Sequence, residues 1–197
     1  MKTRFIYKAV FCICFFVRRY YDTFITRIIL SVNDVEYGKS LLSINGIPQL
    51  HISYHAKNVK FGDCVVFNNY NDAGWFSKCS IWVRDGATLN IGDNTGLNGV
   101  LIYSMNSVTI GNDVKVGGGA RIFDTDFHPL DYIARRKDLE GTKTLPVVID
   151  DDVFIGANSI ICKGVHIGAR SIVAAGSVVV KDIPAGEVWG GNPAKFI

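Results

Sequence analysis

The sequence predicts an all-β protein, a solenoid of triangular coils with an α-helical appendage at the N-terminus and one protruding loop. Three observations lead to this fold class. Aliphatic residues recur at every sixth position in the C-terminal half, glycine contributes 20 of the 197 residues, and a thirteen-residue apolar run lies near the N-terminus. With 48% hydrophobic and 20% charged residues, the composition excludes an intrinsically disordered chain.

Residues 1–40 are the predicted appendage. Their apolar run, FIYKAVFCICFFV at residues 5–17, contains Lys8 and is shorter than the roughly 20 residues that span a bilayer. Arg18 and Arg19 follow it, where a signal peptide would need a cleavage site of small residues. Six cations and one acid occur in the first thirty residues. The helix therefore suits either an anionic membrane surface or packing on its own domain or a neighbouring subunit.

Residues 41–197 are the predicted coil, because a period of six fits neither a helix nor a single strand. The aliphatic position of each repeat is expected to face inward: Ile149, Ile155, Ile161, Ile167, Val173 and Val179. A small or β-branched residue follows four positions later: Val153, Ser159, Val165, Ser171, Ser177 and Ile183. Three units close a triangular turn, so residues 18 apart, such as Ile149, Ile167 and Ala185, would stack at the strand spacing of about 4.8 Å.

The repeat continues upstream and has two interruptions. The sixfold spacing also appears in two earlier sets of three residues: Ile91, Leu97 and Tyr103, then Ile110, Val116 and Ile122. Corresponding residues of the two sets are 19 rather than 18 positions apart, which indicates a one-residue insertion. Residues 67–90 lose the sixfold spacing, which leaves the coil boundaries there undefined. The interval from Ile122 to Ile149 is 27 residues and predicts an excursion loop at about 123–147, of the kind that often carries function.

Three motifs resemble the hexapeptide-repeat acyltransferases, with most similarity to the maltose, galactoside and surface-polysaccharide O-acetyltransferases. These motifs are IGANSIICKGVHIGARSIVAAGSVVVKDIP, the closing GGNPAKFI and the loop FDTDFHPLD, and the resemblance covers residues 58–197. It implies a left-handed parallel β-helix, acetyl-CoA as the donor, and a homotrimer with active sites between subunits. The handedness and the trimer come from the resemblance alone.

The resemblance assigns His128, in the DFHP sequence of the loop, to the family's catalytic histidine. An imidazole has the pKa needed to take a proton from a sugar hydroxyl that attacks a thioester. Among the flanking acids, Asp126 is a candidate for orienting that imidazole, although a solvated acidic turn would look the same. The family's acceptor-binding asparagine aligns with Gly99, so the neighbouring Asn98 is the candidate for this contact.

The donor site is implied by the same resemblance. Ala157 and Ala175 match the positions beside the pantetheine arm, and Gly176 keeps that wall open. The cations near the phosphates of coenzyme A match Lys181 and Lys195, and Asn192 is a further candidate from the closing motif. Tight coil corners also require small residues, so the alanines and the glycine have a structural explanation as well.

Charge, histidines and cysteines exclude other classes. The formal net charge of +3 is too balanced to predict nucleic-acid binding. The four histidines lack metal-ligand spacing, so no metal is expected and a zinc hydrolase on a similar helix is disfavoured. The five cysteines form no CxxC pair and are expected to be reduced, buried thiols of a cytoplasmic protein.

The leading hypothesis is an acetyl-CoA-dependent O-acetyltransferase that modifies a saccharide hydroxyl in surface-polysaccharide biosynthesis, by direct transfer with His128 as the base. The acceptor is either free or lipid-linked. In the lipid-linked case, residues 1–30 would contact the inner face of the membrane. One alternative is an N-acetyltransferase of an amino sugar, since the same base would serve an amine. A non-catalytic trimeric β-helix scaffold is the other.

Overall fold

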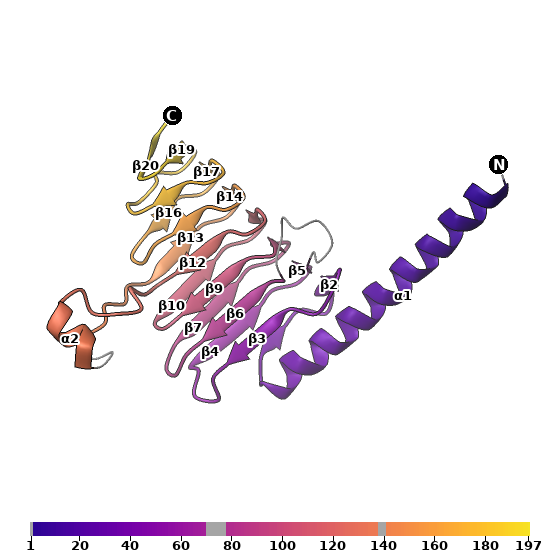
Figure 1. The fold of residues 1–197 in the computed structure, drawn as a ribbon, viewed down its shortest axis with the longest axis horizontal. Coiled ribbons are helices and arrows are strands. Elements are labelled where there is room, and N and C mark those ends of the chain that lie inside the picture. Colours follow the sequence, from indigo (N-terminus) through magenta and orange to yellow (C-terminus); the bar gives the residue numbers. More distant parts are fainter. Residues whose placement is uncertain (1, 70–77, 138–140) are drawn as a thin grey trace.

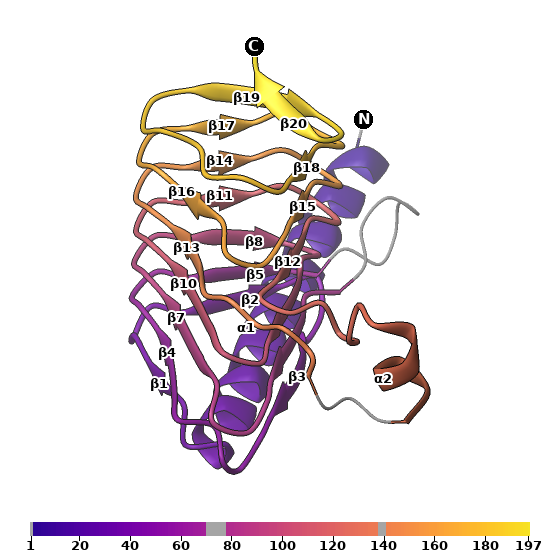
Figure 2. The same cartoon turned by 90° about the vertical axis from the view of Figure 1, so that its left-hand side faces the viewer.

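Three parallel sheets wind into one triangular coil in the computed structural model, which describes residues 2–69, 78–137 and 141–197 (Figures 1 and 2). Sheet A contains β1 (Glu36–Tyr37), β4 (Asn58–Phe61), β7 (Thr88–Ile91), β10 (Ser107–Ile110), β13 (Val147–Ile149) and β16 (His166–Ile167). Sheet B contains β2 (Leu42–Ile44), β5 (Val66–Asn68), β8 (Gly96–Asn98), β11 (Lys115–Val116), β14 (Phe154–Ile155), β17 (Ile172–Val173), β19 (Val188–Gly191) and β20 (Ala194–Phe196). Sheet C contains β3 (Gln49–Ile52), β6 (Ser80–Val83), β9 (Leu101–Ser104), β12 (Arg121–Phe123), β15 (Ile160–Ile161) and β18 (Val178–Val179). The predicted fold, a left-handed parallel β-helix, is confirmed.

The period of six is confirmed as a pattern of burial. All six predicted inward aliphatic residues from Ile149 to Val179 are at most 1% exposed, and the small or β-branched residues four positions after them are buried as well. Ile149 pairs with Ile167, and Ile155 with Val173, which is the 18-residue register that the repeat requires. Each turn therefore covers the apolar core of the turn before it.

Two predicted inward positions are wrong, because turns at the edges of the coil differ in length. Tyr103 faces outward, and its neighbour Ile102 lies in the core and pairs with Ile122. Near the C-terminus, Ile167 forms its bridge with Ile183, whereas Ala185 is exposed. The last turn is thus two residues shorter than the 18-residue repeat.

The N-terminal segment forms the helix α1 (Lys2–Val32), and the coil begins at Glu36 rather than at residue 41, because β1 already pairs with β4. The end of α1 packs on its own domain: Leu30 is fully buried, and the Oγ1 of Thr23 donates to the carbonyl oxygen of Ser43 at 3.0 Å. The remainder of α1 diverges from the coil (Figure 1). Within the described residues, no helix has the length and apolar character that crossing a membrane requires.

The predicted excursion leaves the coil between β12 and β13 and contains the short helix α2 (Tyr132–Lys137), which projects away from the sheets (Figure 1). Residues 138–140 of this loop lie outside the described part. A second long connection joins β5 to β6. It falls within the region 67–90 where the sequence left the boundaries undefined, and its residues 70–77 also lie outside the described part.

At the edge between sheets A and B, successive turns approach so closely that only glycine fits. A Cβ at Gly111 would lie 2.8 Å from the backbone nitrogen of Asp151. The side chains beside these glycines link the turns: the Oδ1 of Asp93 accepts from the backbone N–H of Asp63 at 2.7 Å, and the Oδ1 of Asp151 accepts from that of Asn112 at 2.7 Å. This ladder fixes the register from turn to turn.

Gly111→Ala should therefore lower the free energy of unfolding by about 1–3 kcal/mol, because the added methyl group collides with backbone that cannot move independently. Gly96→Ala is the matched control, since its Cβ would meet only the flexible side chain of Lys115, with the Cδ at 3.5 Å and the Nζ at 3.9 Å. We expect that variant to stay within about 0.5 kcal/mol of the native protein in denaturant unfolding. Equal unfolding midpoints for the two variants would contradict the steric argument.

Candidate functional site

His128 lies in the excursion loop, at the edge where sheet C passes into sheet A, and its side chain is exposed. The residue before it, Phe127, has a φ of 61°, in the left-handed region that side chains other than glycine rarely adopt. The backbone N–H of His128 donates to the carbonyl oxygen of Asp126 at 2.7 Å, which closes a tight turn. The imidazole is thus presented on a constrained turn near the base of the loop, where Thr125 bridges Thr144.

An aromatic cluster on the outer face of sheet C holds this turn. The ring of Phe127 lies 4.9 Å from that of Tyr103 and 5.1 Å from that of Phe123, measured between centroids. Trp82 stacks on the other side of Tyr103 at 6.0 Å. Because these rings pack on Phe127, they offset the backbone cost of its positive φ. The outward position of Tyr103 therefore serves the loop rather than the core.

Asp126 pairs with a lysine that the sequence analysis missed. Its Oδ1 lies 2.8 Å from the Nζ of Lys163, and both side chains are only about a fifth exposed, 21% and 23%. Its Oδ2 is buried and has no hydrogen-bond donor among the described residues. The predicted partnership of this carboxylate with His128 is thus not a contact of the described chain. Lys163 follows β15, directly beside the loop, which only the stacking of turns could reveal.

The other two acids near His128 have structural roles. Asp124 is fully buried and accepts hydrogen bonds from the Oγ of Ser104 and from the backbone N–H groups of Met105 and Asn106, at 2.8–2.9 Å. Asp131 precedes α2, and its Oδ1 accepts from the backbone N–H of Ala134 at 2.8 Å, as a helix cap does. Together they anchor the two ends of the segment that contains His128.

Asn98 lies at the opposite edge of sheet C, where sheet B passes into it. Its Nδ2 donates to the carbonyl oxygen of Val116 at 2.8 Å, and its Oδ1 accepts from the Nδ2 of Asn68 at 2.8 Å. It belongs to a ladder of asparagines that joins successive turns, and it does not meet His128 within one chain.

Five of the six predicted donor-site residues lie near the same edge as Asn98. Two successive corners lie there, one with Ala157 and the next with Ala175 and Gly176. The backbone N–H of Gly176 donates to the carbonyl oxygen of Ala157 at 2.8 Å and so joins them. Asn192 lies where β19 turns into β20, next to Gly191, whose N–H donates to the Oγ of Ser177. Open space surrounds Gly176, so a bound molecule would have access to this wall.

The two predicted lysines lie at different edges of the coil. Lys195 lies on β20 and pairs with Gly190 near the donor edge, whereas Lys181 follows β18 at the edge that carries His128. Both side chains are exposed. One chain therefore presents the donor corners and the histidine at opposite edges of sheet C.

The cysteines do not supply a nucleophile near this site. Burial raises the pKa of Cys79 to about 11, and burial also raises the pKa of Cys162, with the charge of Asp126 adding to it against the opposing effect of Lys163. The expectation of buried thiols is wrong for Cys12, Cys14 and Cys64, which are exposed. Three or more metal-ligating side chains do not gather anywhere in the described residues.

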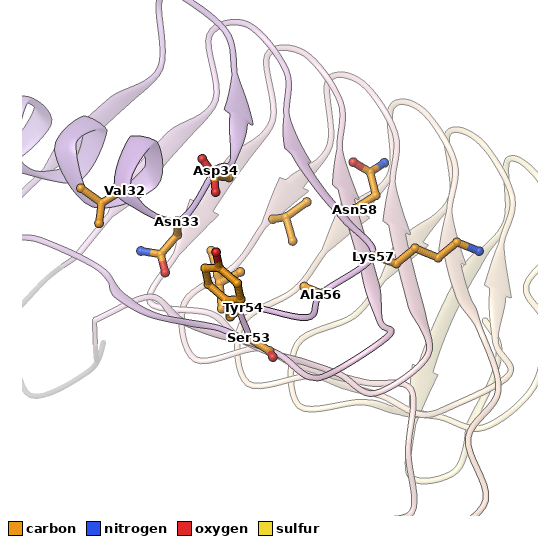
Figure 3. A pocket seen from close by; sticks show the side chains of 10 residues that line it. Val32, Asn33, Asp34, Ser53, Tyr54, Ala56, Lys57 and Asn58 are labelled. Carbon is orange, nitrogen blue, oxygen red and sulfur yellow. The ribbon is translucent and has the colours of Figure 1, made fainter.

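A cavity of about 220 Å³ lies far from these residues, where the end of α1 meets the turn between β3 and β4 (Figure 3). Asn33, Asp34 and Tyr54 line it. It contains none of the predicted site residues, so it does not belong to the candidate site.

The chain is similar to known proteins in its repeat and its fold. A family model for the hexapeptide repeat of succinyl-transferase matches residues 146–181. A 2,3,4,5-tetrahydropyridine-2,6-dicarboxylate N-acetyltransferase of Clostridium perfringens is 59% identical over 59 residues, which are 30% of this chain and 25% of that protein. The chain thus spans about a quarter of the length of the first curated relatives it matches.

Two solved structures share both sequence and fold. A hexapeptide-repeat acetyltransferase from Vibrio cholerae, complexed with acetyl coenzyme A, is 39% identical with a TM-score of 0.53, over 59% of this chain and 62% of that one. A maltose O-acetyltransferase from Clostridium difficile is 32% identical with a TM-score of 0.51, over 55% of this chain and 57% of that one. Fold and repeat together thus define a hexapeptide-repeat β-helix. The resemblance to the hexapeptide-repeat acyltransferases is confirmed.

Replacing Lys163 with methionine should loosen the loop, because it leaves the largely buried carboxylate of Asp126 without its charged partner. We expect amide hydrogen exchange in residues 124–137 to accelerate about tenfold, as a local loss of about 1.4 kcal/mol would cause. Lys143→Met is the control, since that side chain is exposed in the same loop. Unchanged exchange in Lys163→Met would show that the ion pair does not hold the loop.

Proposed function

We propose that this chain is an acetyl-CoA-dependent O-acetyltransferase that transfers the acetyl group directly to a saccharide hydroxyl during surface-polysaccharide biosynthesis. The observation that carries the proposal is the exposed imidazole of His128, on a tight turn that packs on the aromatic cluster and lies beside the ion pair of Asp126 with Lys163. The imidazole takes the proton of the hydroxyl while the hydroxyl oxygen bonds to the thioester carbonyl carbon. The C–S bond then breaks, and the imidazolium returns the proton to the departing thiolate of coenzyme A.

Acetyl-CoA is the proposed donor because the Vibrio cholerae structure holds it on the same fold. In this chain the pantetheine arm would lie along the corners at Ala157, Ala175 and Gly176, and Lys195 would meet the phosphates. A saccharide is the proposed acceptor because the Clostridium difficile structure is a maltose O-acetyltransferase. Asn98 is retained as a weak candidate for the acceptor contact, since its amide already bonds within the asparagine ladder.

A homotrimer is part of the proposal, because one chain holds the donor corners and His128 at opposite edges of sheet C. A neighbouring copy would bring its His128 to the donor edge of the first. The outward row of sheet C supports this arrangement. This row runs through Leu101, Arg121, Ile160 and Val178, and burial of its three aliphatic members favours association.

The proposed location is the cytoplasm, at the inner face of the membrane, with a lipid-linked saccharide as acceptor and residues 1–30 in contact with the surface. The sequence supports this, since its first 21 residues contain cations and no acid. An anionic leaflet attracts such a segment.

His128→Ala should lower acceptor-dependent thiol release from acetyl-CoA by about 10²–10⁴-fold, the usual contribution of a general base, while binding of coenzyme A persists. A chromogenic disulfide measures the release over a panel of saccharides, and His55→Ala, an exposed histidine on another turn, is the control. Equal rates for His128→Ala and the native protein would exclude direct transfer assisted by His128, and release at the background rate in both would favour the scaffold.

N-acetylation is the second candidate function, favoured by the identity to the Clostridium perfringens N-acetyltransferase. The base would act on an amine instead of a hydroxyl. Mild alkali distinguishes the products of the same assay, because it removes an O-acetyl group and leaves an N-acetyl group. A product that resists alkali would replace the O-acetyl proposal with this one.

Deleting residues 2–20 should move the protein from the membrane fraction to the soluble fraction of lysed cells. The deletion leaves Asp22, Thr23 and Leu30, which dock α1 on the coil, in place. Thermal unfolding of the purified variant checks that the coil is intact. An unchanged distribution between the fractions would rule out membrane contact through this segment.

A further inference from the structure

One side of α1 carries a continuous row of large apolar side chains that nothing in the described chain covers. These residues, here called the outer stripe, are between 44% and 79% exposed and follow one another at intervals of three or four: Val10, Ile13, Val17, Tyr20, Phe24 and Ile28. That spacing places them on one face of a helix. An exposed apolar row of this length marks an interaction surface.

The outer stripe faces away from the coil. The side that docks carries Thr23, Thr26 and Leu30, all at most 8% exposed. At about 100° per residue these positions centre roughly 135° around the helix from the stripe. The register of α1 therefore directs the stripe outward, along the length that diverges from the coil (Figure 1).

Three cations, Lys8, Arg18 and Arg19, lie on the other half of the helix from the stripe. Arg27, by contrast, lies nearer the stripe and donates to backbone carbonyl groups of the coil. Lys8 precedes Thr26 by 18 residues, five full turns, and Arg19 precedes it by seven, so both align with the docking side. The only acid of the helix, Asp22, is 4% exposed and accepts from the backbone N–H of Gly46 at 2.8 Å. The same carboxylate lies 3.7 Å from the Nε of Arg18, so the uncompensated positive charge opposite the apolar face rests with Lys8 and Arg19.

We propose that the outer stripe enters the acyl boundary of an anionic membrane while α1 lies in the plane of the surface, with the coil held above it. Charge complementarity selects this occupant: Lys8 and Arg19 have no acidic partner among the described residues, and a second copy of α1 would add cations and no further exposed acid. An anionic surface supplies the opposite charge, and the aromatic residues of the stripe suit the boundary between acyl chains and headgroups. This inference deepens the membrane contact of the proposed function by naming the face that makes it.

Two double variants test the face. Ile13→Glu with Val17→Glu alters the stripe, and Phe11→Glu with Phe15→Glu adds the same charge to the other half, where both phenylalanines are also exposed. Vesicles of phosphatidylcholine with phosphatidylglycerol are sedimented with the full chain. We expect the stripe variant to bind at least about tenfold more weakly than the control variant, because only it removes buried apolar area.

Two native cysteines report the orientation. Cys14 lies four residues after Val10 and three before Val17, so it borders the stripe, whereas Cys12 lies four residues after Lys8 on the cationic half. Both are exposed in the isolated chain, as is Cys64 on the coil. On the anionic vesicles, labelling of Cys14 by a membrane-impermeant maleimide should slow about tenfold, while Cys12 and Cys64 keep their rates.

Any one of three results would overturn the inference. The first two are an equal loss of vesicle binding in the two double variants and equal protection of Cys12 and Cys14 from maleimide on the vesicles. The third is a disulfide between the Cys14 residues of two copies in the absence of vesicles, which would show that a second copy covers the stripe. These measurements use neither acetyl-CoA nor an acceptor. Thiol release with a soluble saccharide is measured separately on the stripe variant and should match the native protein. Failure of that assay in the native protein, with Cys14 protected, would refute the proposed function and leave the membrane face standing.

Discussion

The close approach of successive turns at the edge between sheets A and B is the constraint on which the rest of the structure depends. The backbone of the next turn fits there because the facing residues are glycines: Gly62, Gly92 and Gly111. A carboxylate or amide oxygen from that next turn accepts a hydrogen bond from the backbone N–H beside each glycine. One residue of slippage would break every contact of this ladder and turn the inward aliphatic rows outward. Fixed register in turn decides which distant residues meet at each edge of the coil.

Much of the coil could be predicted from the sequence, because the residues that recur at every sixth position are the ones whose side chains are buried. Each turn buries one aliphatic residue per side, so Ile149, Ile155 and Ile161 report three sides of one turn. The errors arose where edge turns change length. Tyr103 holds the expected phase in the sequence, but a shortened turn places Ile102 in the core instead. Such changes leave the local aliphatic spacing almost intact, and only strand pairing reveals them.

The candidate site was less predictable, since its geometry depends on contacts between turns. A motif identified His128, but nothing local to it indicates Lys163, which is 35 residues away and lies beside Asp126 only because β15 stacks on β12. The positive φ of Phe127 likewise depends on Tyr103, from the turn before. The carboxylate predicted to orient the imidazole is instead the anchor of its loop.

Helix α1 joins the coil for a reason that also explains its uncovered side. The first turn has no turn beneath it, so its core must be closed by another element, as in other solenoids. Leu30 closes it, and the Oγ1 of Thr23 both donates to the carbonyl oxygen of Ser43 and accepts from its N–H, at 3.0 Å in each case. Closing the coil uses one side of the helix only. The angle between that side and the outer stripe then sets how the coil stands relative to whatever the stripe contacts.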